Sequence, residues 1–133
     1  MSYNQIGILL AICVIAFVGV TWRKVHNPYL KSLWRSALVV FTLYGALLIY
    51  IEIHWQFIAE YAQKFDLNGN GFVDLNEYSE EAINAMNKQT NGKNVRIYAP
   101  ATMAVLSSII GFAFLVSDVA VTRLKQKKSE KKL

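Results

Sequence analysis

Three long runs of apolar residues, separated by polar segments, are the main pattern along the chain. They cover Ile6–Trp22, Leu33–Ile53 and Tyr98–Val121. With a helical rise of about 1.5 Å per residue, the first run is close to the shortest that crosses a hydrocarbon core of about 30 Å, and the other two are longer. The pattern predicts an all-α membrane protein with three transmembrane helices.

The residues that flank these runs agree with membrane-spanning helices. No charged side chain precedes the first run, whereas Arg23 and Lys24 follow it. A secretory signal peptide carries its positive charges in front of the apolar segment, so we interpret this run as an uncleaved span. Aromatic residues lie near both ends of the second run, as is typical of the membrane–water interface. We expect Pro100 in the first turn of the third helix.

The composition fits the same class, because 54% of the 133 residues are hydrophobic, against about 45–50% in an ordinary soluble domain. The net charge of +5 does not indicate a nucleic-acid partner, since most Lys and Arg residues directly flank the apolar runs. The single cysteine, Cys13, lies inside the first run, where we interpret it as a small apolar residue. No catalytic constellation is present, so we do not expect an enzyme.

The positions of the basic residues also predict an orientation. Four of them lie in or beside the short connection between the first two runs, and six lie in the tail after the third. By the positive-inside rule, both of these segments are cytoplasmic. We therefore expect a protein of the bacterial inner membrane, with its N-terminus and its long, acid-rich second connection in the periplasm. The basic tail would then rest against anionic lipid headgroups.

The long connection contains a stretch in which oxygen-bearing side chains recur at alternate positions, Asp66-Leu67-Asn68-Gly69-Asn70-Gly71-Phe72-Val73-Asp74-Leu75-Asn76-Glu77. Calcium takes six to eight hard oxygen ligands. The candidate ligands are the backbone carbonyl of Phe72 and the side chains of Asp66, Asn68, Asn70, Asp74 and Glu77. Gly71 stands where the chain must turn sharply. Apolar residues at helical spacing lie on both sides of the stretch, which predicts a helix–loop–helix.

This stretch and its flanks resemble the EF-hand superfamily over about Ile58–Met86, roughly a fifth of the chain. The resemblance implies one extramembrane EF-hand between the second and third spans, with Ca²⁺ as its ligand. It implies that Glu77 binds through both carboxylate oxygens and that Asp74 binds directly or through a water. It also implies that Val73 takes part in a short β-pairing with a partner loop.

Two departures from the EF-hand pattern affect this expectation. Asn68 and Asn70 stand where family members often carry Asp, so only three carboxylates remain, and we expect a weak site with a Kd of ~10⁻⁵ to 10⁻³ M. EF-hands also usually occur in pairs, but the segment Asn87–Tyr98 has no acidic residue and is rejected as a second loop. We expect the exiting helix to end before the turn-forming dipeptide Asn91-Gly92.

These predictions divide the chain into three parts. Residues 1–57 form the first two spans with their basic connection, residues 58–91 form the EF-hand, and residues 92–133 form the third span and the basic tail.

Three polar residues near the ends of the spans have more than one interpretation. Glu52 and His54 are more simply an interfacial polar pair than a transition-metal site, because two residues apart on a helix they do not share a face. Asp118 favours an ion pair with the nearby basic tail over a place in an ion path. Ser107 and Gly111 form a small-xxx-small pair that suits close helix packing, within the bundle or between copies.

The sequence favours a calcium-binding accessory subunit of a larger membrane protein complex, with other membrane subunits and the lipid bilayer as partners. A thin bundle of three spans and an unpaired EF-hand both leave apolar surface that would dock on a neighbour. The alternatives are a calcium-regulated membrane sensor, or a component of a homo-oligomeric channel or transporter. A channel would need more polar residues in the spans than the sequence has.

Overall fold

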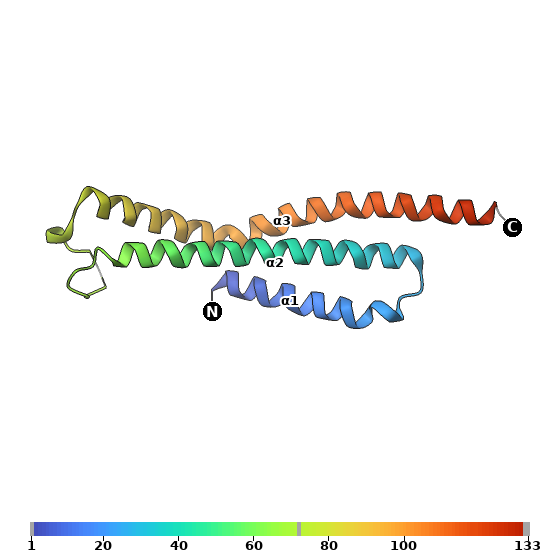
Figure 1. Ribbon diagram of the computed structural model, residues 1–133, viewed down its shortest axis with the longest axis horizontal. Helices are drawn as coiled ribbons and strands as arrows, with labels where there is room; N and C mark the ends of the chain where they lie inside the picture. Colours follow the sequence, from blue (N-terminus) through green and yellow to red (C-terminus); the bar gives the residue numbers. More distant parts are fainter. Residues whose placement is uncertain (1, 72, 132–133) are drawn as a thin grey trace.

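The computed structural model describes residues 2–71 and 73–131, and three long helices dominate it (Figure 1). The elements follow in the order α1 (Tyr3–Thr21), η1 (Trp22–Lys24), α2 (Pro28–Gln63), η2 (Leu75–Glu77) and α3 (Glu80–Glu130). Each long helix is apolar enough and long enough to cross a membrane, which is consistent with an integral membrane protein. The described residues contain no strand. The predicted all-helical class with three helices of spanning length is therefore confirmed.

Side-chain caps fix the start of each long helix. At α1, the Ser2 hydroxyl accepts the backbone N–H of Gln5, and the Gln5 side chain accepts the backbone N–H of Ser2. Asn27 caps α2, and Pro28 occupies its first turn, where a missing N–H does no harm. Ser79 caps α3 and is followed by acidic residues, which favour the positive end of the helix dipole.

Helix α2 lies between α1 and α3 and packs against both (Figure 1). Helices α3 and α2 approach each other closely at Gly111, where an added Cβ would lie only 2.0 Å from Cγ2 of Val40. The Ser36 hydroxyl donates a hydrogen bond of 2.7 Å to the Gly111 carbonyl at the same place. Ser107, one turn earlier, is fully buried. The predicted small-xxx-small pair thus serves packing within the bundle.

The buried apolar core is small and follows the central part of α2. It consists of Tyr44 and Leu48 of α2 with Ala11 of α1 and Ala99 of α3. Most large apolar side chains of the three helices are exposed. Such an outer surface suits a surrounding hydrocarbon phase and is unusual for a water-soluble bundle.

Helix α3 differs from the sequence prediction in two respects. The expected end before Asn91-Gly92 is wrong, because the helix is continuous through both residues. A Cβ on Gly92 would lie 3.2 Å from the Trp55 ring, so the glycine allows α3 to pack closely on α2. Pro100 lies inside the helix and not in its first turn. It has no N–H for the Arg96 carbonyl four residues earlier, and α3 bends in this region (Figure 1).

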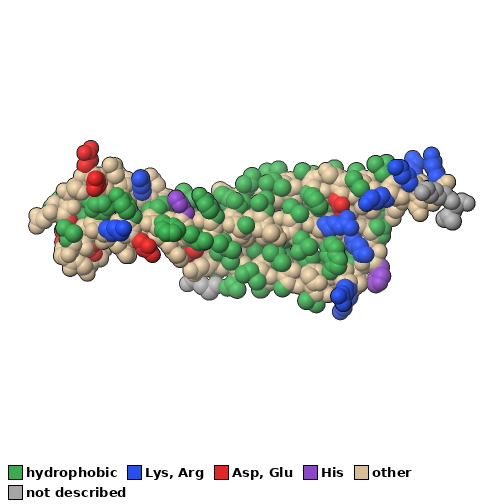
Figure 2. All heavy atoms as spheres, viewed as in Figure 1, with side chains coloured by type: hydrophobic (Ala, Val, Ile, Leu, Met, Phe, Trp, Pro, Cys, Tyr) green, Lys and Arg blue, Asp and Glu red, His purple; other side chains and the backbone are tan. Residues whose placement is uncertain are grey.

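Two layers of polar side chains tie the helices together near the ends of the apolar segment. We call the first the tail-side layer, which contains an Arg35–Asp118 ion pair of 3.1 Å between α2 and α3. Its other members form hydrogen bonds between helices, Trp34 with Thr21 at 2.9 Å and Ser32 with Thr122 at 3.2 Å. Figure 2 shows Lys and Arg side chains gathered around this end of the molecule.

We call the second the loop-side layer, and it joins all three helices. Arg96 of α3 forms a two-pronged ion pair with Glu52 of α2, with 2.8 Å between Arg96 Nε and Glu52 Oε2. The fully buried Asn4 of α1 donates from its amide nitrogen to Glu52 Oε2 and to the Leu48 carbonyl, each at 3.0 Å. Gln5 adds a longer bond of 3.4 Å to Glu52.

The two layers enclose an apolar segment of nearly membrane thickness. Glu52 lies 17 residues after Arg35 (52 − 35), or about 25 Å along α2. Beyond the loop-side layer, α2 and α3 continue side by side as a helical hairpin that we call the arm, residues 53–63 and 80–95. The arm extends for about 16 Å along α2 and carries the polar connection at its tip (Figure 1).

Candidate metal-binding loop

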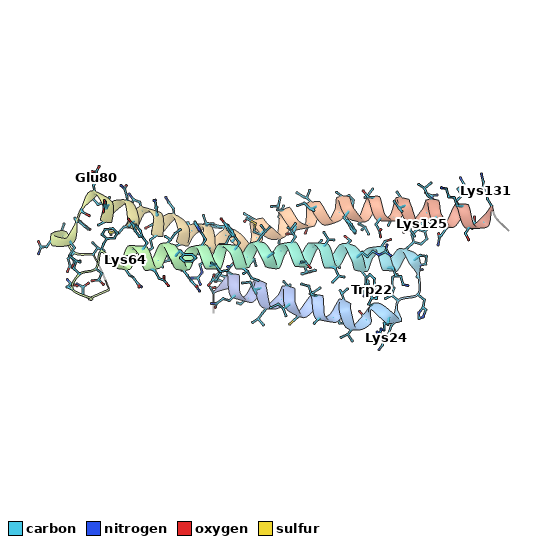
Figure 3. The ribbon with its side chains drawn as sticks, viewed as in Figure 1. Trp22, Lys24, Lys64, Glu80, Lys125 and Lys131 are labelled. Carbon is cyan, nitrogen blue, oxygen red and sulfur yellow. The ribbon has the colours of Figure 1, made fainter. Side chains whose placement is uncertain are left out.

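The loop that connects α2 to α3 lies at the tip of the arm. In Figure 3, Lys64 and Glu80 mark its two sides, at the opposite end of the molecule from Lys125 and Lys131. Both helices that hold the loop run without interruption into the apolar segment. A loop between two helices therefore connects the second and third spans, and these helices belong to the spans themselves.

The Asp66 carboxylate organises the first half of the loop. Its Oδ1 accepts the backbone N–H groups of Gly69 at 2.9 Å and Asn70 at 3.2 Å, and its Oδ2 accepts that of Gly71 at 2.7 Å. Gly69 and Gly71 have φ values of 71° and 88°, which glycine adopts without strain. These two glycines let the chain turn back around the carboxylate.

The Glu77 carboxylate closes the loop from its other end. Its Oε1 accepts the backbone N–H groups of Leu67 and Asn68, both at 3.0 Å. Its Oε2 accepts the backbone N–H of Asp74 at 3.1 Å, which forms a capping box for the short helix η2. Glu77, the last predicted ligand, thus lies beside Leu67 and Asn68, which follow the first ligand, Asp66.

The Asp74 carboxylate contacts the two asparagine side chains of the loop. Its Oδ2 accepts the side-chain amides of Asn68 at 2.8 Å and Asn70 at 2.9 Å. Asn70 also donates its backbone N–H to the Asn68 side-chain oxygen at 3.0 Å. Five predicted ligand side chains therefore belong to one hydrogen-bonded network. The sixth, the Phe72 carbonyl, lies outside the described residues.

The chemistry of the loop fits a hard cation, although its carboxylates are held by N–H groups in this structure. Within residues 2–71 and 73–131, no three His, Cys, Asp or Glu side chains are grouped closely enough to hold a metal ion by themselves. Calcium would also use amide and carbonyl oxygens. For that, the Asn68 and Asn70 amides must rotate so that oxygen replaces nitrogen toward Asp74.

Glu52 and His54 have separate surroundings. Glu52 belongs to the loop-side layer described above, whereas the His54 ring stacks on Tyr50 with ring centroids 6.0 Å apart. The two side chains thus have different partners, as expected of residues two positions apart that do not share a helix face. Sequence spacing gave no sign of Arg96, the actual partner of Glu52, which lies 44 residues away.

Asp118 forms an ion pair, as predicted, but not with the basic tail. Its partner is Arg35 of α2, with 3.1 Å between Arg35 Nη1 and Asp118 Oδ1. The tail itself continues α3 as a helix to Glu130. Cys13 is exposed on α1, on a helix surface that is otherwise largely apolar.

Comparison of the chain with protein-family models, with curated proteins and with solved structures found no match. The case for a function therefore depends on the residues and contacts described above.

Proposed function

We propose that this chain is a calcium-binding accessory subunit of a membrane protein complex, with the loop Asp66–Glu77 as its calcium site. The observation that carries the proposal is a single hydrogen-bonded network in this loop, which contains the side chains of Asp66, Asp74 and Glu77. A divalent cation bound among these three carboxylates would balance their negative charge. Asp66, Asn68, Asn70, Asp74 and Glu77, with the Phe72 carbonyl, would hold the ion.

An assembly role is supported by how the polar side chains of the apolar segment are used. Two ion pairs link α2 to α3, Arg35 with Asp118 and Glu52 with Arg96. The Ser36 hydroxyl also donates a hydrogen bond to the backbone of α3. Such groups hold the three helices together and do not line a continuous path for ions. This arrangement favours a subunit over a channel.

The orientation that we propose places the loop on the outer side of a bacterial inner membrane. The basic side chains around the tail-side layer support it, since cytoplasmic segments carry an excess of Lys and Arg. Calcium is abundant outside the cell, so a weak site of ~10⁻⁵ to 10⁻³ M would stay largely filled there. The ion would then be structural, holding the two helices of the arm together at their tip.

A calcium sensor is the second candidate, and the continuity of α2 and α3 from the loop into the apolar segment favours it. A sensor must, however, have two arrangements that the ion biases. The loop-side layer joins α1, α2 and α3 at the base of the arm. These contacts oppose a change in the angle between the two helices of the arm.

Isothermal titration calorimetry on the full chain in mild detergent tests calcium binding. We expect saturable binding of one calcium ion, which disappears in Glu77→Gln. Co-purification from the native membrane, with and without a calcium chelator, tests the subunit role. The absence of calcium-dependent heat at 10 mM calcium, with the helical content intact, would refute the calcium site. Migration as an isolated chain under every mild extraction condition would refute the accessory role.

A further inference from the structure

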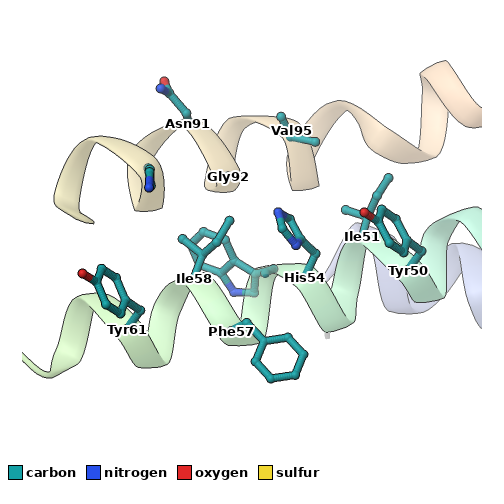
Figure 4. A pocket seen from close by; sticks show the side chains of 11 residues that line it. Tyr50, Ile51, His54, Phe57, Ile58, Tyr61, Asn91, Gly92 and Val95 are labelled. Carbon is teal, nitrogen blue, oxygen red and sulfur yellow. The ribbon is translucent and has the colours of Figure 1, made fainter. Parts of the chain in front are cut away.

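A groove runs along the arm between α2 and α3, on the membrane side of the calcium loop. Its volume is about 810 Å³, and Figure 4 shows side chains of both helices around it. Ile58 and Trp55 of α2 and Val95 of α3 contribute to its walls. Gly92 contributes only backbone, and it packs closely against the Trp55 ring.

The end of the groove nearer the loop-side layer opens at the level of the membrane. Two of its lining residues, Tyr50 and Ile51, precede Glu52 of the loop-side layer and so lie on the apolar segment of α2. Tyr50 has 66% of its surface exposed, toward the side that lipid would occupy. The groove is therefore continuous with the lipid-facing surface, and a chain of a lipid can enter it without crossing water.

The end of the groove nearer the tip of the arm carries a positive charge, that of Lys88. Lys88 lies eight residues before Arg96 on α3, about 12 Å farther from the apolar segment. No acidic residue is among the described residues that line the groove. The long, flexible side chain of Lys88 lets its ammonium group reach back toward the headgroup level. An apolar channel that ends at a cation matches an amphiphile with an anionic head.

We propose that this groove binds one phospholipid with a net negative headgroup, taken from the leaflet on the loop side. An acyl chain lies between α2 and α3 against Trp55 and Val95, and the headgroup phosphate contacts the Lys88 ammonium. A purely apolar helix of a partner in the same place would remove Lys88 from water without a counter-charge, which is unfavourable. The site depends on the membrane placement of the helices and not on calcium.

Trp55 provides a direct reporter for the bound chain. We replace the other two tryptophans (Trp22→Phe, Trp34→Phe) and reconstitute the full chain in phosphatidylcholine vesicles. Increasing fractions of phosphatidylglycerol or phosphatidylcholine with brominated acyl chains are then added, because bromine quenches tryptophan on contact. We expect brominated phosphatidylglycerol to quench Trp55 at about fivefold lower mole fraction than brominated phosphatidylcholine, as expected for one lysine near an anionic lipid.

Matched variants identify the source of this preference. Lys88→Gln removes the lining cation and should abolish the fivefold preference. Lys93→Gln removes an exposed cation on the same helix that does not line the groove, and should leave the preference intact. Val95→Phe narrows the groove and should reduce quenching by either lipid, whereas Ile97→Phe, outside the lining, should not. Equal quenching by the two lipids, or an equal loss in Lys88→Gln and Lys93→Gln, would overturn the proposal.

Native mass spectrometry of the unmodified chain gives an independent test that needs no tryptophan replacement. We expect one phosphatidylglycerol molecule to stay bound after mild delipidation and to be lost in Lys88→Gln. A lipid-free dimer would show that a second copy covers the groove, and a lipid-free monomer would show that nothing does. Either result would contradict a lipid site, while calorimetric calcium binding would remain a separate measurement.

Discussion

At the residue scale, the loop must balance the three carboxylates of Asp66, Asp74 and Glu77, which lie within one stretch of twelve residues. In this structure, backbone and amide N–H groups perform that task, with three such donors on Asp66, three on Glu77 and two on Asp74. Each donor carries only a partial charge, whereas a calcium ion carries two full charges. Once the Asn68 and Asn70 amides have rotated, the bound ion should therefore stabilise the loop more strongly than the N–H groups do.

Glu77→Gln should remove most of this stabilisation, because Glu77 supplies the predicted bidentate ligand and also closes the loop. With a Kd of about 10⁻⁴ M, 10 mM calcium stabilises the native state by about 2.7 kcal/mol, following RT ln(1 + [L]/Kd). We expect this calcium to raise the Tm of the native sequence by several degrees, and to have almost no effect on Glu77→Gln. Thermal unfolding in detergent, followed by circular dichroism, measures both.

The matched control is Glu80→Gln, which removes an exposed carboxylate from the first turn of α3, three residues away. Its calcium-dependent rise in Tm should equal that of the native sequence. If Glu80→Gln and Glu77→Gln lose the rise equally, general charge screening explains the calcium effect and a specific site does not.

Packing inside the bundle gives a second prediction at this scale. Gly111→Ala places a Cβ 2.0 Å from Cγ2 of Val40 and should destabilise the bundle by about 1–3 kcal/mol. Gly19→Ala is the matched control, since a Cβ at Gly19 has no neighbour within 4 Å, and alanine is the better helix former. Chemical unfolding in mixed detergent measures the difference. Equal stability of the two variants would contradict the close contact at Gly111.

At the scale of elements, the apolar runs were sufficient to predict three helices, but not that α3 runs without a break from the loop into the third run. A glycine with an asparagine favours a turn locally, yet Gly92 stays helical because it packs against the Trp55 ring of α2. That contact joins residues 37 positions apart (92 − 55), so no local signal reveals it. The same reason explains why Arg96 and Arg35 were not recognised as the partners of Glu52 and Asp118.

The candidate loop was more accessible to sequence analysis, because the hydrogen bonds of its described residues join positions of one short stretch. Asp66 and Glu77 accept N–H groups of this stretch, and the positive φ values fall at two glycines that the sequence displays directly. By contrast, the groove in the arm depends on how two distant helix segments pack, and only the presence of apolar residues there was visible beforehand.

The ion pair between Glu52 and Arg96 should be the main polar contact between α2 and α3 at the base of the arm. Their side chains are 13% and 25% exposed, so removal of either partner leaves a poorly hydrated charge. Arg96→Met and Glu52→Gln should each destabilise the chain by about 1–3 kcal/mol, and the double variant by less than their sum. Chemical unfolding of the four proteins in one detergent measures the coupling. Additive losses would contradict a direct interaction.

At the scale of the whole molecule, two polar layers about 25 Å apart along α2 define the segment that suits the hydrocarbon core. This length is below the average of about 30 Å, so the chain fits a thin bilayer or one that adapts locally around it. Beyond one layer lies the arm with its candidate calcium loop and apolar groove. Beyond the other, α3 continues as a basic helix to Glu130. The two ends of the molecule thus present different chemistry to the two sides.

This asymmetry leads to the final prediction, on orientation. Cysteines at Asn84 in the arm and at Ser129 near the end of α3, each in a Cys13→Ala background, should react with a membrane-impermeant thiol reagent from opposite sides. Both positions are exposed, so the membrane and not the fold limits their reaction. In intact bacterial cells we expect Asn84→Cys to react, because the proposed orientation places the loop side outward, and Ser129→Cys to react only after permeabilisation. Reaction of Ser129→Cys in intact cells would invert the topology. The loop would then face a compartment with very little free calcium, where a site with a Kd of ~10⁻⁵ to 10⁻³ M would stay empty and the structural role of the ion would be untenable.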